Sequence, residues 1–119
     1  MSNIVSCVAE VDIHDGQVDH LKAVMSAMID DIQRDEPGTL NYEWFLADDG
    51  KSYQVYERYT DSEAYMVHLG IFGQKYAEQI MPHVTITKIT LYGNPSDAVR
   101  GVFAALPTTY MSRTAGVDR

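Results

Sequence analysis

The stretch TLNYEWFLADDGKSYQVYERY, residues 39–59, contains two runs in which large apolar side chains recur at every second position. A period of two residues is typical of a β-strand, because successive side chains point to opposite faces of the sheet. The first run covers residues 39–46 and the second covers 53–59. Asp48-Asp49-Gly50 between them has the composition of a tight turn. The sequence therefore predicts a β-hairpin.

Upstream of the hairpin, the sequence predicts a strand and a helix. Residues 4–13 carry β-branched and small apolar residues on both parities, which is typical of a strand buried on both faces. Asp15 is a candidate N-cap, and apolar residues follow at helical spacing until Glu36-Pro37-Gly38 ends the run. These residues are Val18, Leu21, Val24, Met25, Met28, Ile29 and Ile32.

Downstream of the hairpin, helical segments lead to a last strand. Thr60-Asp61-Ser62-Glu63 matches a capping box, with Thr60 as the cap, and predicts a helix that begins at Asp61 and breaks near Gly70. A second short helix is expected up to Pro82, with Phe72, Tyr76 and Ile80 on one face. Residues 84–92 are largely β-branched and predict the fourth strand.

The predicted fold class is α+β. Its order βαββαβ is typical of a ferredoxin-like fold, with a four-stranded antiparallel sheet and both helical segments on one face. We expect one domain over residues 1–119, with a C-terminal extension at 94–119. In that extension Asn94 would cap a helix that has Pro95 at its first position and runs to about Ala104. The tail beyond Pro107 has no predicted structure.

The second face of this sheet needs a cover. Several strands carry apolar or aromatic residues on both parities, and the helices can cover only one face. Another copy of the chain is the simplest second layer, so we expect a homodimer formed through the sheet faces. The C-terminal extension is expected to reach across to the partner.

The charge of the chain argues against polyanionic partners. Its 119 residues contain 9 Lys and Arg against 17 Asp and Glu, for a net charge of −8. Phosphate backbones and anionic membrane surfaces are bound by clustered Lys and Arg, and the sequence has no such cluster. No apolar run approaches the ~18 residues of a membrane span. We therefore expect neither nucleic acid nor a membrane as a partner.

The N-terminal segment and the single cysteine indicate a cytoplasmic protein. Residues 1–10 lack the basic region and the cleavage site of a secretory signal. Cys7 is the only cysteine and cannot form a disulfide within its own chain. His14, His20 and His83 show no metal-ligand spacing, so no metal site is expected. The chain also lacks the Gly-rich phosphate loops and the nucleophile elbow that mark nucleotide-binding proteins and hydrolases.

Several short segments resemble the signature of the antibiotic biosynthesis monooxygenase-like family of dimeric α+β barrels. They are Glu36-Pro-Gly-Thr-Leu-Asn-Tyr-Glu43, Tyr56-Glu-Arg-Tyr59, Asp61-Ser-Glu-Ala64 and His68-Leu69, and the resemblance spans roughly residues 4–92. Residues 91–97 and the helix after them resemble the C-terminal extension of an uncharacterised branch of that family.

The resemblance implies an enzyme without a cofactor. Characterised members of the family are cofactor-independent oxygenases of phenols or quinols, and other relatives degrade haem or bind and isomerise small molecules. The haem-degrading relatives carry an Asn on the first strand and an axial His on the second helical segment. This chain has Ser6 and Cys7 on the strand, and Ala77 and Glu78 on the helix. No haem is therefore expected.

His68 is the candidate catalytic residue, because it is the only one of the four histidines inside the signature. A histidine can take a phenolic proton at physiological pH, and the resulting phenolate gives an electron to O2 more readily than the phenol. The alternative interpretation is a buried imidazole bonded to Glu57 or to a backbone carbonyl. Glu57 would itself form an ion pair with His68, Lys88 or Arg58 of a neighbouring copy, or would orient His68.

Aromatic residues are expected to form the substrate-binding pocket. Tyr and Trp combine an apolar body with a polar tip, which suits a pocket that holds a flat apolar ligand and orients one oxygen. The alternative is that they fill the core and the dimer interface. The candidate substrate-binding residues are Tyr42, Trp44, Glu57, Tyr59, Phe72 and Tyr76.

The function predicted from the sequence is a cofactor-independent monooxygenase that oxidises a phenolic or quinol-type small molecule with O2. The main alternative is a non-enzymatic carrier or sensor of a hydrophobic small molecule such as a fatty acid. A third is an isomerase of the lactone or quinone type. The fold alone does not choose between these chemistries.

Overall fold

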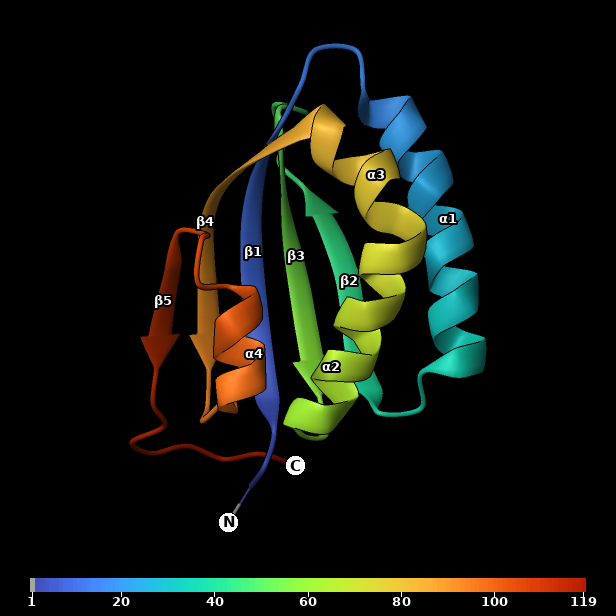
Figure 1. Ribbon diagram of the computed structural model, residues 1–119. Coiled ribbons are helices and arrows are strands. Elements are labelled where there is room, and N and C mark those ends of the chain that lie inside the picture. Colours follow the sequence, from blue (N-terminus) through green and yellow to red (C-terminus); the bar gives the residue numbers. More distant parts are fainter. Residues whose placement is uncertain (1) are drawn as a thin grey trace.

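Five strands form one sheet in the order β2-β3-β1-β4-β5, and helices lie on one of its faces (Figure 1). The computed structural model describes residues 2–119. The strands are β1 (Val5–Ile13), β2 (Thr39–Leu46), β3 (Ser52–Tyr59), β4 (Val84–Tyr92) and β5 (Thr108–Met111). The helical segments are α1 (Val18–Asp35), α2 (Ser62–Ile71), the π-helix η1 (Phe72–Tyr76), α3 (Ala77–Ile80), the 3-10 helix η2 (Met81–His83) and α4 (Asp97–Val102).

The first four strands confirm the predicted α+β, ferredoxin-like order. β1 lies in the middle and pairs antiparallel with both β3 and β4, while β2 pairs antiparallel with β3. The predicted hairpin is thus present, with Trp44 opposite Val55 and Tyr42 opposite Glu57. This register brings Tyr42, Trp44 and Glu57 to the same face of the sheet.

The prediction of a four-stranded, wholly antiparallel sheet was wrong. The tail beyond Pro107 contains β5, which pairs parallel with β4. The Ile89 amide donates to the Pro107 carbonyl at 2.8 Å, and the Gly93 amide donates to the Met111 carbonyl at 3.0 Å. These bonds satisfy backbone groups that β4 would otherwise leave unpaired.

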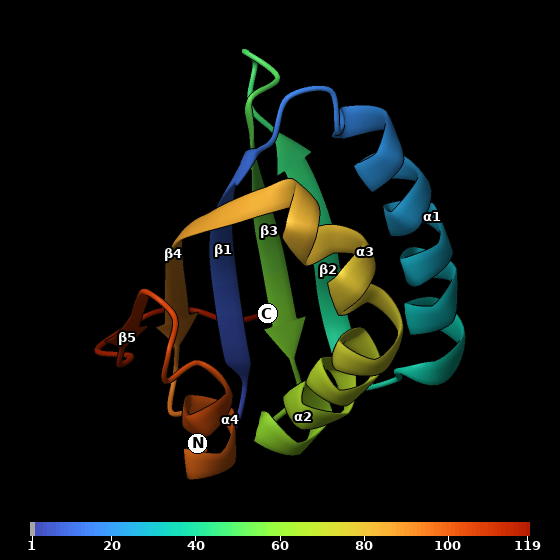
Figure 2. The same ribbon diagram turned by 45° about the horizontal axis from the view of Figure 1, so that its top comes forward.

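The C-terminal extension packs on the sheet of its own chain. Figure 2 shows α4 and α2 on the same face of the sheet, on either side of β1. Val99 of α4 is fully buried, and Phe103 is 7% exposed. After β5 the chain turns back toward β3, where Asp118 pairs with Arg58 at 2.6 Å. The extension is thus held to the sheet of its own chain at both α4 and the tail, and its contact with a partner stays a prediction.

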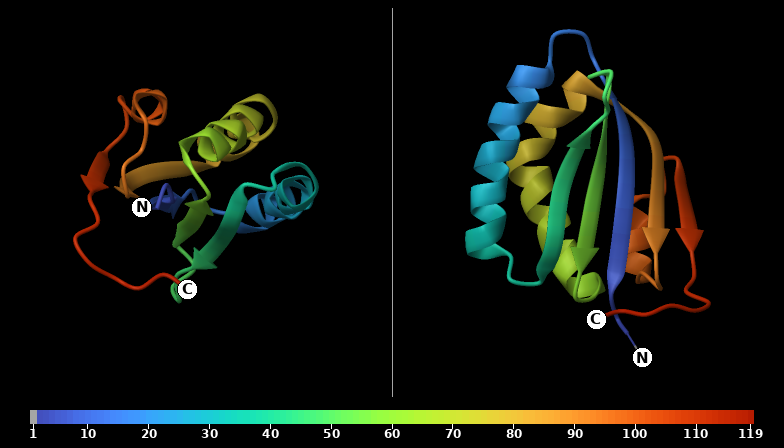
Figure 3. Two further views of the ribbon diagram at one scale, coloured as in Figure 1. Left: turned by 90° about the horizontal axis from the view of Figure 1, so that it is seen from below. Right: turned by 180° about the vertical axis from the view of Figure 1, so that it is seen from behind.

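The opposite face of the sheet is open. The view from behind shows the strands with no helix in front of them (Figure 3). Within residues 2–119 no helix covers this face, and Phe45, Tyr56 and Tyr92 are 55%, 37% and 42% exposed. Each of the three alternates with a neighbour, Trp44, Val55 or Leu91, that points toward the helices.

The helix ends differ from those predicted because neighbouring residues compete to cap them. Asp61, not Thr60, caps α2, and its Oδ1 accepts from the Ala64 amide at 2.8 Å. Both residue types favour N-caps, so the sequence pattern could not fix the position to one residue. Ser96, not Asn94, caps α4 in the same way and accepts from the Val99 amide at 3.3 Å.

Two further helix boundaries were misplaced. α1 begins at Val18 after Gln17, and Asp15 lies in the preceding turn, where Gly16 has a φ of +77°. The helix after β3 does not break at Gly70 but continues through Ile71 into η1. A single glycine inside a helix costs only about 1 kcal/mol relative to alanine, which neighbouring packing offsets.

Candidate functional site

A cavity of about 250 Å³ lies between the sheet and the helices. β1, β2, β3 and β4 supply one side, the segment from α2 to η2 supplies a second, and α4 with the residues after it supplies a third. The walls are mostly apolar. Besides the polar tips of Tyr42, Trp44 and Tyr65, the lining residues carry the thiol of Cys7, the carboxyl group of Glu57 and the imidazole of His68.

His68 lies on the cavity wall and is 3% exposed. It belongs to the face of α2 that packs on the sheet, one turn after the buried Tyr65. Its Nδ1 lies 2.9 Å from Oε1 of Glu36, and its Nε2 lies 3.8 Å from Oε1 of Glu57. A carboxylate only accepts hydrogen bonds, so the contact with Glu36 places a hydrogen on Nδ1, and in the neutral tautomer that this favours the lone pair is on Nε2.

Glu36 is a site residue that sequence analysis missed. It follows the last turn of α1, is 4% exposed and accepts from Thr39 Oγ1 at 2.9 Å as well as from His68. In the sequence it marked a helix end beside Pro37 and opened one of the segments that carry the family resemblance, but it was assigned no role in the site. Its contact with His68 joins positions 32 residues apart, and no local spacing signals such a pair.

Glu57 is 7% exposed and points from β3 toward the cavity. The Tyr59 hydroxyl donates to its Oε1 at 2.6 Å. Burial raises the pKa of Glu57, while His68 and the Tyr59 hydroxyl act in the opposite direction. Of the ion-pair partners predicted for Glu57, His68 lies beside it, with Nε2 3.8 Å from Oε1.

Three of the predicted aromatic residues, Tyr42, Trp44 and Phe72, line the cavity. The ring centres of Tyr42 and Phe72 lie 4.9 and 6.3 Å from that of His68. The buried Nε1 of Trp44 has no hydrogen-bond partner anywhere in residues 2–119. The structure thus brings His68, Glu57 and these three side chains around one space.

Tyr59 lies behind the wall rather than on it. Its ring stacks on Tyr65 with centres 4.1 Å apart, and Tyr65 lines the cavity in its place. Burial raises the pKa of Tyr59 and of Tyr65 well above the ordinary value, and the negative charge of the nearby Glu57 adds a smaller effect in the same direction. These hydroxyls therefore stay protonated at neutral pH. The spacing of three residues between Tyr65 and His68 on one helix face was the sequence signal for Tyr65.

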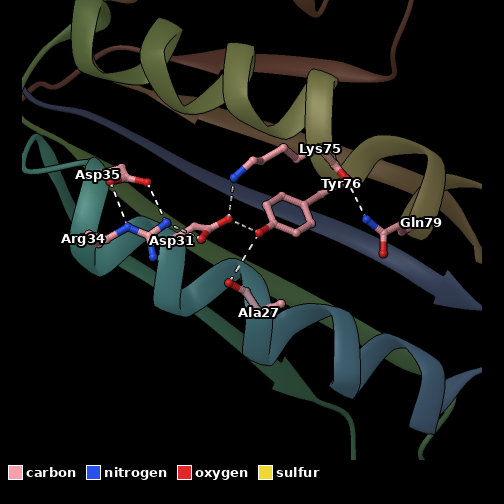
Figure 4. A network of polar contacts seen from close by, with 7 residues as sticks. All are labelled: Ala27, Asp31, Arg34, Asp35, Lys75, Tyr76 and Gln79. Carbon is pink, nitrogen blue, oxygen red and sulfur yellow. Dashed lines mark hydrogen bonds and ion pairs between the residues drawn. The ribbon is translucent and has the colours of Figure 1, made fainter.

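Tyr76 is not among the cavity-lining residues, although the sequence placed it with Phe72. Its hydroxyl donates to Asp31 of α1, which also accepts from Lys75 at 3.1 Å and from Arg34 at 2.7 Å (Figure 4). The Tyr76 and Lys75 hydrogen bonds lower the pKa of Asp31 to about 2, and the bond to Asp31 raises the pKa of Tyr76 to about 12. This network ties η1 to α1.

The site resembles a general-base arrangement in its geometry. A carboxylate that accepts from one imidazole nitrogen fixes the tautomer and supports positive charge on the ring when the other nitrogen takes a proton. Glu36 stands in that position to His68. No lysine or arginine is among the lining residues. The described chain, residues 2–119, offers no group of three His, Cys, Asp or Glu side chains suited to a metal ion, and none of its helices could span a membrane.

Comparison with known proteins places this geometry in context. The sequence profile described as antibiotic biosynthesis monooxygenase matches residues 4–71. Among solved structures, MupZ from Pseudomonas fluorescens has a TM-score of 0.86 at 18% identity, with 99% of this chain and 96% of that chain covered. No curated protein matches the sequence.

Two further structures are similar over a smaller share of the chain. SnoaB from Streptomyces nogalater, a cofactor-independent oxygenase, has a TM-score of 0.66 at 18% identity and covers 80% of this chain and 96% of its own. Protein SO0527 from Shewanella oneidensis has a TM-score of 0.62 at 25% identity, with 76% and 88% covered. The likeness to MupZ and SnoaB shows a shared fold.

Proposed function

The chain belongs to the antibiotic biosynthesis monooxygenase family, and from that premise we propose that it oxidises a phenolic or quinol-type small molecule with O2 without a cofactor. The observation that carries the proposal is His68 on the cavity wall, with Nδ1 held by Glu36 and Nε2 left as a proton acceptor. His68 is the proposed general base. Tyr42, Trp44 and Phe72 form the walls against which the ring of the substrate packs.

The proposed reaction begins with a proton transfer. The phenolic O–H bond breaks, its proton moves to His68 Nε2, and the electron pair remains on the phenolate oxygen. The flanking Glu36 and Glu57 carboxyl groups stabilise the imidazolium. The phenolate then reduces O2. Overall, a ring CH2 group in the keto tautomer of the substrate becomes a carbonyl group. One oxygen atom of O2 enters that carbonyl and the other leaves as water. The substrate therefore supplies all four electrons that reduce O2.

The charge of the cavity supports a neutral hydroxyl-bearing ligand over a fatty acid. At its polar end the imidazole of His68 lies between the buried carboxyl groups of Glu36 and Glu57. A ligand carboxylate would have to lose its hydration there with no lysine or arginine among the lining residues to pair with it. A phenol can instead donate to an acceptor and accept from the free Nε1–H of Trp44.

We therefore expect 2-naphthol to bind more tightly than 2-naphthoate by about 10²-fold, since like charges brought together cost several kcal/mol. Quenching of Trp44, the only tryptophan, measures both affinities. Glu57→Gln should reduce the difference, while Glu43→Gln, an exposed residue of β2, should leave it unchanged. Tighter binding of naphthoate by the wild type would contradict this expectation and favour the fatty-acid carrier.

We also propose that the protein is a homodimer formed through its open sheet face. Phe45, Tyr56 and Tyr92 expose apolar surface there, and such surface is typical of an interface. Light scattering should return twice the 13.4 kDa chain mass. Phe45→Glu should shift the protein toward the monomer, and Val67→Glu on the exposed side of α2 should not. A wild type that stays monomeric at micromolar concentration would sink this proposal.

Oxygen consumption tests the proposed chemistry directly. Protein freed of flavin, haem and metal is mixed with a panel of hydroquinones and polycyclic phenols in an oxygen electrode. We expect at least one compound to be oxidised faster than in buffer, with saturation in its concentration. Saturable binding of the panel with oxygen uptake at the uncatalysed level would refute the enzyme and support the carrier.

A further inference from the structure

The cavity is lined by exposed residues on the side of η1, η2 and α4. Three of its lining residues are exposed: Gly73 in η1, Met81 in η2 and Val102 in α4, of which Met81 and Val102 are 38% and 46% exposed. At the other end Glu57 and His68 are 7% and 3% exposed. Gly73, Met81 and Val102 therefore form the exposed rim of the cavity, which we call its opening.

One side of this opening is a fixed wall. The Ser96 amide donates to Ser62 Oγ at 2.9 Å, which joins the start of α4 to the start of α2. The guanidinium of Arg100 lies 4.3 Å from the ring centre of Tyr110 and joins α4 to β5. The buried Val99 anchors the helix on the sheet. α4 therefore holds Val102 in place.

The other side is the π-helix η1, which the Lys75 and Tyr76 contacts to Asp31 hold against α1. A Cβ atom added at Gly73 would meet no atom within 4 Å. Because Gly73 lines the cavity, its missing side chain leaves the opening wide. π-helical turns are frequent at functional sites because the extra residue redirects the side chains around it.

Both sides lie outside the segment that defines the family, because the family match ends at residue 71. Glu36, Glu57 and His68 lie within the matched segment, whereas the residues of this opening lie beyond it. Members of the family can therefore admit ligands of different size through changes in η1 and α4, while the polar end of the cavity stays the same.

We propose that ligands enter the cavity between η1 and α4, and that Gly73 and Val102 set the width of the ligand admitted. The ligand class that suits this opening is a neutral, flat, hydroxylated aromatic molecule whose hydroxyl group goes in first. The inference deepens the proposed function by assigning the entrance and the specificity of the same cavity. It concerns binding and is measured without turnover.

The first test narrows the opening from η1. Gly73→Leu should slow the association of 9-phenanthrol with the protein about 10-fold or more, read as stopped-flow quenching of Trp44. Gly70→Leu is the matched control, because Gly70 is also helical and has open space around it but does not line the cavity. It should bind at the wild-type rate. The narrower 2-naphthol should be slowed less than 9-phenanthrol.

The second test narrows the opening with a larger side chain on α4. Its result therefore does not depend on whether the π-helix η1 keeps its structure with leucine at position 73. Val102→Phe should also slow 9-phenanthrol more than 2-naphthol. Val67→Phe is its control, since Val67 is a similarly exposed helical valine that does not line the cavity. Circular dichroism checks that all four variants keep the wild-type helix content.

The proposal is overturned if the folded Gly73→Leu and Val102→Phe variants both bind 9-phenanthrol at the wild-type rate. It is also overturned if the two controls slow binding equally, or if the wild type binds neither compound. Failure of the proposed function has a different outcome: the wild type binds these phenols with the expected width dependence and consumes no oxygen.

Discussion

Replacing His68 by alanine is expected to lower the rate of phenol oxidation about 10²- to 10⁴-fold, the usual contribution of a general base. The physical reason is that alanine removes Nε2, the proton acceptor on the cavity wall, and leaves Tyr42, Trp44 and Phe72 to hold the ring. Ligand affinity should therefore change much less than the rate. Oxygen uptake measures the first quantity and quenching of Trp44 the second.

The matched control is His20→Ala. His20 is exposed, its Nε2 bonds the Gln79 carbonyl at 2.8 Å, and neither residue is among those that line the cavity. This variant should oxidise the same compound at the wild-type rate. A His68→Ala protein that keeps full activity while folded would remove the base from the mechanism and leave the cavity as a binding site.

Replacing Glu36 by alanine is expected to lower the free energy of unfolding by about 3 kcal/mol, because the buried imidazole of His68 and the Thr39 hydroxyl both lose their acceptor. Urea denaturation measures this loss. Glu36→Gln keeps a carbonyl oxygen in the same place and should cost less stability. It carries no negative charge to support the imidazolium, so its oxidation rate should still fall.

The two Glu36 variants together separate positioning from packing. If Glu36 is only structural, the oxidation rate should follow the free energy of unfolding, and Glu36→Gln should recover both quantities relative to Glu36→Ala. A positioning role predicts that Glu36→Gln regains stability without the rate, and that its KM stays near the wild-type value while kcat falls. Glu43→Gln on the exposed side of β2 serves as the control for loss of one negative charge.

The fold could be predicted where a pattern repeats over a whole element. Residues 39–59 alternate between apolar and polar side chains, and α1 has an apolar residue on the same face at each helical turn. The predicted hairpin and the predicted helix are both present. β5 has only four residues, and its partner β4 lies well upstream in the sequence. This strand forms because its backbone groups form hydrogen bonds with the free edge of β4. Every residue carries these groups, so the sequence pattern does not indicate the pairing.

The site could be predicted in part for the same reason. His68 was identified through the resemblance, and Tyr42 and Trp44 follow from strand alternation. Glu36 reaches His68 because α1 ends beside α2, which is a tertiary contact. Tyr76 was grouped with Phe72 on the assumption of an α-helix, in which residues four apart share a face. A π-helix bonds residues five apart, so the pair separates and Tyr76 turns to Asp31.

Burial makes the Cys7 thiol resistant to oxidation, although it lies on the wall of the cavity. Oxidants attack a thiolate rather than a thiol, and burial raises the pKa of Cys7, with Glu57 adding to the effect. The side chain therefore stays a neutral thiol at physiological pH. Reduced oxygen species released during turnover would meet no sulfur nucleophile at the polar end. The only other sulfur on the cavity wall belongs to Met81 at the entrance, so sulfoxide formation is expected there first.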